Sequence, residues 1–256
     1  MEIKLSNLNI SDKDTDIINI KNCCNPFTEG LWCKECIDYL KRSAENDDKV
    51  AMFNLANRYR DEEGTEKNSE KAFHWYQKAA EKDHIKAMNS LALCYYDGKG
   101  TEKDLEKAFH WYQKAAENGD EVAMNSSAIC YYHGEGTEKN YEKAFYWYQK
   151  AAENGDEKAM YNLTICYKNG KGTEKDLEKA FHWYQKAAEN GDEVAMNSSA
   201  ICYYHGEGTE KNYEKAFYWY QKAAENGDEK AMYNLTICYK NGKGTEKDLE
   251  KAFCWH

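Results

Sequence analysis

The residues whose types and spacing could bind a metal are four cysteines near the N-terminus. Cys33 and Cys36 have the C-x-x-C spacing of a zinc-ligand pair, whereas Cys23 and Cys24 are adjacent. Because one pair alone has suitable spacing, two interpretations stay open: a degenerate zinc knuckle, or thiols buried by packing. We favour burial, and therefore predict no metal site and no bound cofactor.

No other combination of residues indicates catalysis. The Gly-x-Gly pairs that begin at positions 98, 134, 170, 206 and 242 lack the third glycine and the preceding strand of a nucleotide-binding loop, so we interpret them as turns. The sequence also lacks the common hydrolase, kinase and metalloprotease motifs. His74, His110 and His182 share a helix position with Tyr146 and Tyr218, which favours a surface role over metal binding. We predict that the protein is not an enzyme.

The composition disfavours several classes of partner. With 45 acidic and 35 basic side chains, the formal net charge of −10 argues against binding to nucleic acid or anionic lipid. No apolar run approaches the roughly 20 residues that span a bilayer, and the polar N-terminus lacks the apolar centre of a signal peptide. One cysteine recurs every 36 residues, too far from its equivalents for disulfides in stacked helices. We therefore expect a cytoplasmic protein with reduced thiols.

Internal repetition dominates the sequence. The pair Ala-Met begins at positions 51, 87, 123, 159, 195 and 231, which gives a period of 36 residues. A second period of 72 residues is superimposed, because residues 101–181 and 173–253 are identical. This identity indicates duplication with little divergence, and it argues against a single, unique active site.

Each unit contains the signals for two antiparallel helices. In residues 104–136, an apolar stripe with helical spacing follows the cap residue Asp104 and stops before Gly119. Asp120 can cap the next helix, whose inward face is expected to include Ser127. The positions expected to define the repeat are Gly98, Gly100, Ala108, Trp111, Tyr112, Ala115, Gly119, Gly134 and Gly136.

The repeat pattern resembles a known family. It is formed by Tyr95, Gly98, Gly100, Lys107, Ala108, Trp111, Tyr112, Lys114, Ala115, Ala116, Glu117 and Gly119, and it is similar to the Sel1-like repeat, a relative of the tetratricopeptide helix hairpin. The resemblance covers about residues 49–256 and implies an all-α fold, a right-handed α-solenoid of helix-turn-helix repeats. Glu62 departs from the pattern, since later units have a glycine there, so we expect a distorted first turn.

The repeat register predicts three segments. Residues 1–26 are expected to be a polar, poorly ordered lead, and residues 27–48 a degenerate half-repeat with the cysteine cluster. Residues 49–256 are expected to hold five full repeats of 36 residues and a truncated sixth. Within the half-repeat, residues 33–46 match the pattern of a second helix, which aligns Cys33 and Cys36 with core positions.

The remaining face of each first helix is the candidate binding surface. The resemblance implies that first helices line the concave side of the solenoid, where asparagine could bind an extended backbone and tyrosine offers contact area. The candidates are Asn89, Tyr96, Asn125, Tyr132, Tyr161, Lys168, Asn197, Tyr204, Tyr233 and Lys240. The alternative, that these residues form inter-repeat contacts, stays open.

We therefore expect a non-catalytic scaffold or signalling adaptor that binds a partner protein or an extended peptide on its concave face. One alternative is a structural module that self-associates through its uncapped C-terminal end. Another, implied by the resemblance, is the regulatory repeat region of a kinase-associated signalling protein.

Overall fold

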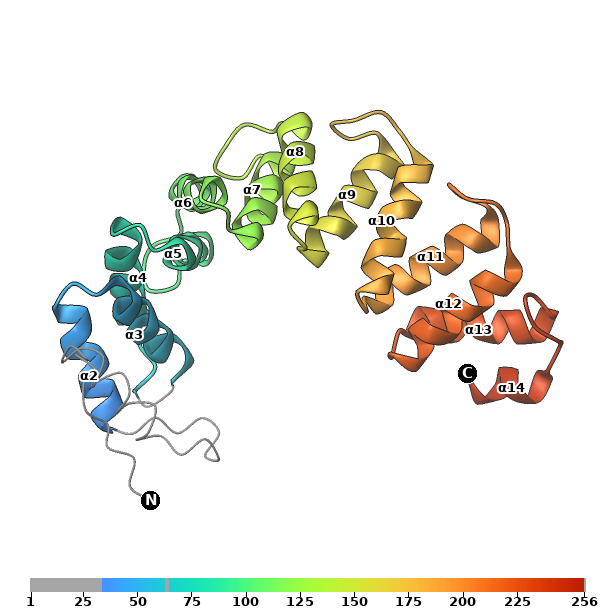
Figure 1. The fold of residues 1–256 in the computed structure, drawn as a ribbon, viewed down its shortest axis with the longest axis horizontal. Coiled ribbons are helices and arrows are strands. Elements are labelled where there is room, and N and C mark those ends of the chain that lie inside the picture. Colours follow the sequence, from blue (N-terminus) through green and yellow to red (C-terminus); the bar gives the residue numbers. More distant parts are fainter. Residues whose placement is uncertain (1–33, 63–64, 256) are drawn as a thin grey trace, which may run out of the picture. The chain divides into compact units, whose positions relative to one another are not determined.

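The computed structural model describes residues 34–62 and 65–255, and every regular element in these ranges is an α-helix (Figure 1). The helices fall into two compact units, Met1–Trp111 and Tyr112–His256. Consecutive helices pack against each other within each unit, as expected for stacked helix hairpins. The predicted all-α repeat solenoid is confirmed.

The described part of the first unit begins with α2 (Lys34–Glu45), which packs on α3 (Lys49–Asp61). It continues through α4 (Ser69–Glu81) and α5 (Ile85–Asp97), and α6 (Leu105–Glu117) contains the boundary between the units. The helix predicted at residues 33–46 is thus present as α2, and Cys36 is buried in it. Cys23, Cys24 and Cys33 lie outside the described residues.

The second unit contains four hairpins, each with a first and a second helix. Its helices are α7 (Glu121–His133), α8 (Tyr141–Glu153), α9 (Glu157–Asn169), α10 (Leu177–Glu189), α11 (Glu193–His205), α12 (Tyr213–Glu225), α13 (Glu229–Asn241) and α14 (Leu249–Cys254). The first helices are α7, α9, α11 and α13, and the second helices are α8, α10, α12 and α14.

Short polar side chains begin these helices and glycines end the first helix of each hairpin. The side chain of Asp120 accepts a backbone N–H bond of 2.8 Å at the start of α7, and Asn140 does the same at 2.8 Å for α8. Gly134 follows α7 in the left-handed conformation, with a φ of 77°. The predicted cap at Asp120 is confirmed, and Gly134, which was expected to turn the chain, is the C-terminal cap of α7.

The two glycines of each Gly-x-Gly turn have different roles. Gly170 ends α9 with a φ of 66°, as a left-handed helix cap. Gly172 has a φ of 71°, and a Cβ added there would overlap the carbonyl group of Tyr141 at the start of α8. The second glycine therefore lets the turn of one repeat lie against the backbone of the preceding repeat.

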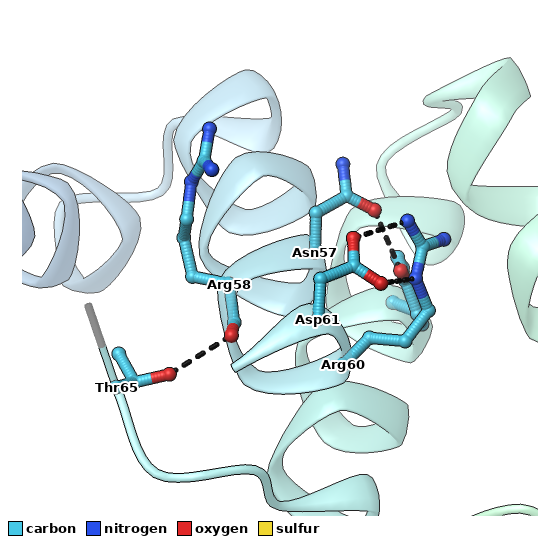
Figure 2. Close-up of polar contacts among 6 residues, drawn as sticks. Asn57, Arg58, Arg60, Asp61 and Thr65 are labelled. Carbon is cyan, nitrogen blue, oxygen red and sulfur yellow. Dashed lines mark hydrogen bonds and ion pairs between the residues drawn. The ribbon is translucent and has the colours of Figure 1, made fainter. Parts of the chain in front are cut away.

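Glu62 takes the conformation that glycine takes in later repeats. Its φ of 64° and ψ of 26° match the 70° and 33° of Gly98, and its N–H bonds to the Arg58 carbonyl. The same carbonyl accepts the Thr65 hydroxyl at 2.9 Å (Figure 2). The expected distortion is absent at this cap, because Glu62 adopts the left-handed conformation of Gly98, whereas residues 63 and 64 of the turn lie outside the described residues.

Glu62→Gly should stabilise the first unit by about 0.5–1 kcal/mol. A residue with a Cβ pays roughly 1–2 kcal/mol in the left-handed region, and the greater freedom of glycine in the unfolded chain offsets part of that gain. Urea denaturation followed by circular dichroism measures the change. Glu66→Gly is the control, since Glu66 is not among the described non-glycine residues with positive φ. An equal gain from both substitutions would contradict the strain at Glu62.

Alanine and tyrosine fill the space between neighbouring helices. In α8 the buried side chains are Ala144, Tyr148, Ala151 and Ala152, and the equivalent residues of α10 and α12 are buried too. The first helix α9 contributes Ala159, Met160, Leu163, Thr164, Cys166 and Tyr167. Small residues allow close approach of the helix backbones, and the tyrosine rings occupy the gaps between them. The side of each first helix that is opposite these buried residues is the candidate binding surface.

Candidate partner-binding surface

The buried cysteines of the repeats are poor nucleophiles. Burial raises the pKa of the Cys166 thiol to about 11 and that of Cys130 to about 12, so both stay protonated at neutral pH. In the part of the chain that the structure describes, no group of three or more His, Cys, Asp or Glu side chains could hold a metal ion. These thiols therefore act as small core residues.

A polar cluster in the first unit also lacks a poised catalytic group. Arg60 donates two hydrogen bonds to Asp61, at 2.7 and 2.6 Å, and Tyr76 donates one to Asn57 at 2.6 Å (Figure 2). The hydrogen bond from Arg60 lowers the pKa of Asp61, and burial raises the pKa of Tyr76 to about 12. Neither group is thus suited to act as a general base near neutral pH. A cavity of about 320 Å³ lies beside them.

The predicted asparagines of the second unit are buried contacts between repeats. Asn125 and Asn197 are 5% and 4% exposed. The carboxamide of Asn125 accepts a hydrogen bond of 3.1 Å from Asn162 on the next first helix, and Asn197 accepts one of 3.1 Å from Asn234. For these two residues the structure favours the inter-repeat alternative. Asn89, in the first unit, is half-buried.

The predicted tyrosines divide into two groups. Tyr132 and Tyr204 are half-buried, and each lies edge-on to a ring at the start of the following second helix, Tyr141 or Tyr213, at 5.1 Å between centroids. Tyr96 is also half-buried. In contrast, Tyr161 and Tyr233 are 38% and 61% exposed. The second group offers the larger aromatic area to a partner.

The two predicted lysines lie on the surface. Lys168 is exposed and forms an ion pair of 3.4 Å with Glu207, the residue after the cap of α11. Lys240, its equivalent two repeats later, is exposed as well. An exposed pair of this kind contributes little to stability, so both lysines can respond to a partner.

The exposed tyrosines each border a cleft between two first helices. The first cleft, of about 490 Å³, is lined by Asn125, Ile129, Glu157, Lys158, Tyr161, Asn162, Asp192 and Val194. The second cleft, of about 460 Å³, is lined by Asn197, Ile201, Glu229, Lys230, Tyr233 and Asn234. Both clefts contain an isoleucine, a phenol ring, a hydrogen-bonded pair of carboxamides, a glutamate and a lysine, and the first cleft adds Asp192 and Val194. Such a lining suits a peptide segment better than a phosphate or a metal.

Sequence reasoning identified two residues of each cleft, Asn125 and Tyr161 in the first and Asn197 and Tyr233 in the second, and missed the others. Glu157, Lys158 and Asn162 were not predicted, although Tyr161 on the same helix was, because their contact with the preceding first helix cannot be inferred from the pattern of a single helix. The spacing of 37 residues between Asn125 and Asn162, repeated between Asn197 and Asn234, is the signal that could have revealed them. This spacing is one residue longer than the repeat period, as expected for a contact between successive first helices.

A family model described as Sel1 repeat matches residues 49–84, 85–120, 122–156, 157–192, 194–228 and 229–256. The chain belongs to the Sel1 repeat family. Sel1 repeat proteins generally mediate protein–protein interactions. None of the Sel1 helices in the described ranges combines the length and the apolar character that crossing a membrane requires.

Solved structures of other Sel1 repeat proteins resemble this chain. A protective antigen of uropathogenic Escherichia coli strains has a TM-score of 0.83 at 31% identity, over 86% of this chain and 47% of the antigen. The present chain thus spans about half the length of that antigen. A Sel1 repeat protein from Oxalobacter formigenes has a TM-score of 0.72 at 35% identity, over 88% of this chain and 86% of that one. No curated protein matches the sequence.

Proposed function

We propose that this Sel1 repeat protein is a non-catalytic scaffold that binds an extended segment of a partner protein on the first-helix face of residues 112–256. The observation that carries the proposal is the pair of clefts, in which Tyr161 and Tyr233 are exposed beside hydrogen-bonded carboxamides. Tyrosine is enriched among residues that dominate binding energy, because its ring buries a large area at low entropic cost.

The clefts also support a revised choice of contact residues. Buried Asn125 and Asn197 act through Asn162 and Asn234, which they hold in place, whereas Tyr132 and Tyr204 support the start of the next second helix. The partner's contacts are therefore assigned to the exposed tyrosines and to the residues around them. Lys168 and Lys240 lie on the same first helices, α9 and α13, and are proposed as outer contacts.

Peptide display tests the proposal with a matched control. Peptides selected on the wild-type protein should lose at least about tenfold in affinity for the double variant Tyr161→Ala/Tyr233→Ala, as expected when a tyrosine anchor is removed. The control is Tyr146→Ala/Tyr218→Ala, which removes two tyrosines of the second helices that are 52% and 51% exposed. Circular dichroism should show both variants folded. Equal loss in both, or peptides that bind both variants as well as wild type, would contradict a site on the first helices.

The finer features of this role are part of the same proposal. The net charge of −10 supports a partner other than nucleic acid, and a cytoplasmic signalling adaptor is the setting we propose. Self-association through the C-terminal helix is the main alternative, and a regulatory role beside a kinase is another. Phe253 is 81% exposed, and its equivalent Phe217 packs edge-on against Tyr239 at 5.2 Å. A mass that rises with concentration and falls with Phe253→Ser would support self-association.

A further inference from the structure

The two clefts are copies of one site. Residues 101–181 and 173–253 are identical, and these ranges contain both clefts, so each lining residue of the second cleft has its counterpart 72 positions earlier. The surroundings repeat as well, because the rings that support Tyr132 and Tyr204 are identical. A ligand that fits one cleft therefore meets the same chemical groups in the other.

The geometry of the two copies also agrees. The carboxamide hydrogen bond is 3.1 Å in both clefts, and the supporting ring pairs have the same 5.1 Å separation and 70° interplanar angle. The volumes are about 490 and 460 Å³. One difference remains: Asp192, the N-cap residue of α11, and Val194 of that helix also border the first cleft. The shared lining predicts similar affinities for a short ligand.

The order of side chains along the array places one cleft every second repeat. Each cleft lies between a first helix with asparagine at the candidate position, α7 or α11, and the next first helix with tyrosine there, α9 or α13. Between α9 and α11 this order is reversed. Since packed helices lie about 8–10 Å apart, two repeats separate the clefts by on the order of 20 Å. An extended chain covers that distance in about six residues.

We propose that the two clefts form a bivalent site, and that its partner is a protein segment carrying the same short motif twice. This inference rests on the proposed function and names the class of partner. Each motif is extended and centred on an apolar side chain. That side chain contacts Ile129 and Tyr161 in the first cleft, or Ile201 and Tyr233 in the second. The motif has little net charge, because the charged residues that both clefts share, Glu157 and Lys158 or Glu229 and Lys230, are of opposite sign. Linking two motifs raises the effective concentration of the second, and such avidity reaches 10²–10⁴-fold.

The first experiment asks whether the clefts share one specificity. Peptides are selected by display on Tyr233→Ala, in which the first cleft is intact, and are then titrated into Tyr161→Ala, in which the second cleft is intact. Isothermal titration should give dissociation constants within about threefold for the two variants, and two peptides bound per wild-type chain. Binding to one variant alone, or one peptide per wild-type chain, would overturn the inference while leaving a binding cleft in place.

The second experiment tests bivalence with a synthetic peptide that holds the selected motif twice. A flexible linker joins the two motifs, so that their starts lie about 20 Å apart. This tandem peptide should bind the wild-type protein at least 100-fold more tightly than the single motif does, with one peptide bound per chain. The gain should vanish in either single variant, and also when the second motif is scrambled. A tandem peptide that crosslinks two chains, or gains nothing, contradicts one bivalent site. Selections in which no binder depends on either tyrosine would instead refute the proposed function.

Discussion

Gly172→Ala should destabilise the protein by about 3–5 kcal/mol, whereas Gly191→Ala should cost about 1 kcal/mol. Both glycines have positive φ, 71° and 103°, so each substitution places a residue with a Cβ in an unfavourable left-handed conformation, which lowers the stability. At Gly172 the added Cβ also overlaps the backbone carbonyl of Tyr141, while at Gly191 no atom lies within 4 Å of it. Because backbone cannot turn aside as a side chain can, the turn at Gly172 must move away from α8, which disrupts the stacking of two repeats.

Hydrogen exchange read by mass spectrometry measures this effect with an internal control. Peptides from residues 101–181 and 173–253 have identical sequences in the wild type, but the substituted copy differs in mass from its duplicate. Exchange in the peptide that contains position 172 should accelerate strongly, and its duplicate around Gly244 should change less. Equal, small effects of Gly172→Ala and Gly191→Ala would show that the contact with Tyr141 does not restrict this position.

Local signals in the sequence predicted the helices well, because they depend on neighbours within one turn of chain. Asp120 could be placed as a cap, and Gly134 as a turn residue, from residue type and position alone. The separate roles of Gly170 and Gly172 could not be predicted, since both appear as turn glycines. What distinguishes them is the approach of a neighbouring repeat, which depends on the distance between stacked hairpins. At Glu62 a residue type that is unfavourable in the left-handed region occurs beside local hydrogen bonds to the Arg58 carbonyl, which residue type alone does not predict.

The candidate site was predicted in part for the same reason. Helical periodicity placed Asn125, Ile129 and Tyr132 on one face of α7, but it could not show how far α9 covers that face. Asn125 is buried because Asn162 of α9 lies against it, whereas Tyr161, one residue earlier, stays exposed. The exposure of a residue on a solenoid surface depends on its own helix and on the neighbouring helix. The sequence pattern of one helix therefore cannot predict that exposure alone.

Leu163→Ala and Ser127→Ala should have opposite effects, although the two residues occupy equivalent positions of neighbouring repeats. Both side chains are 0% exposed. Leu163→Ala removes buried methyl groups and leaves a cavity, which typically costs about 2–5 kcal/mol. Ser127→Ala removes a buried hydroxyl that has no hydrogen-bond partner among the described residues. Since an unsatisfied buried hydroxyl costs about 1–3 kcal/mol, its removal should stabilise the protein by about 1 kcal/mol.

Urea denaturation of single variants tests the sign, and Ser126→Ala provides the matched control. The Ser126 hydroxyl donates a 3.0 Å hydrogen bond to the Val122 carbonyl near the surface of α7, so its removal should change stability little. Ser199→Ala should reproduce the gain of Ser127→Ala, because Ser199 is the duplicate and is likewise without a partner among the described residues. A loss of stability in both serine variants would mean that these hydroxyls are satisfied, by buried water or by a second rotamer. The duplicated repeats would then tolerate serine at a leucine position through hydrogen bonding rather than at a cost in stability.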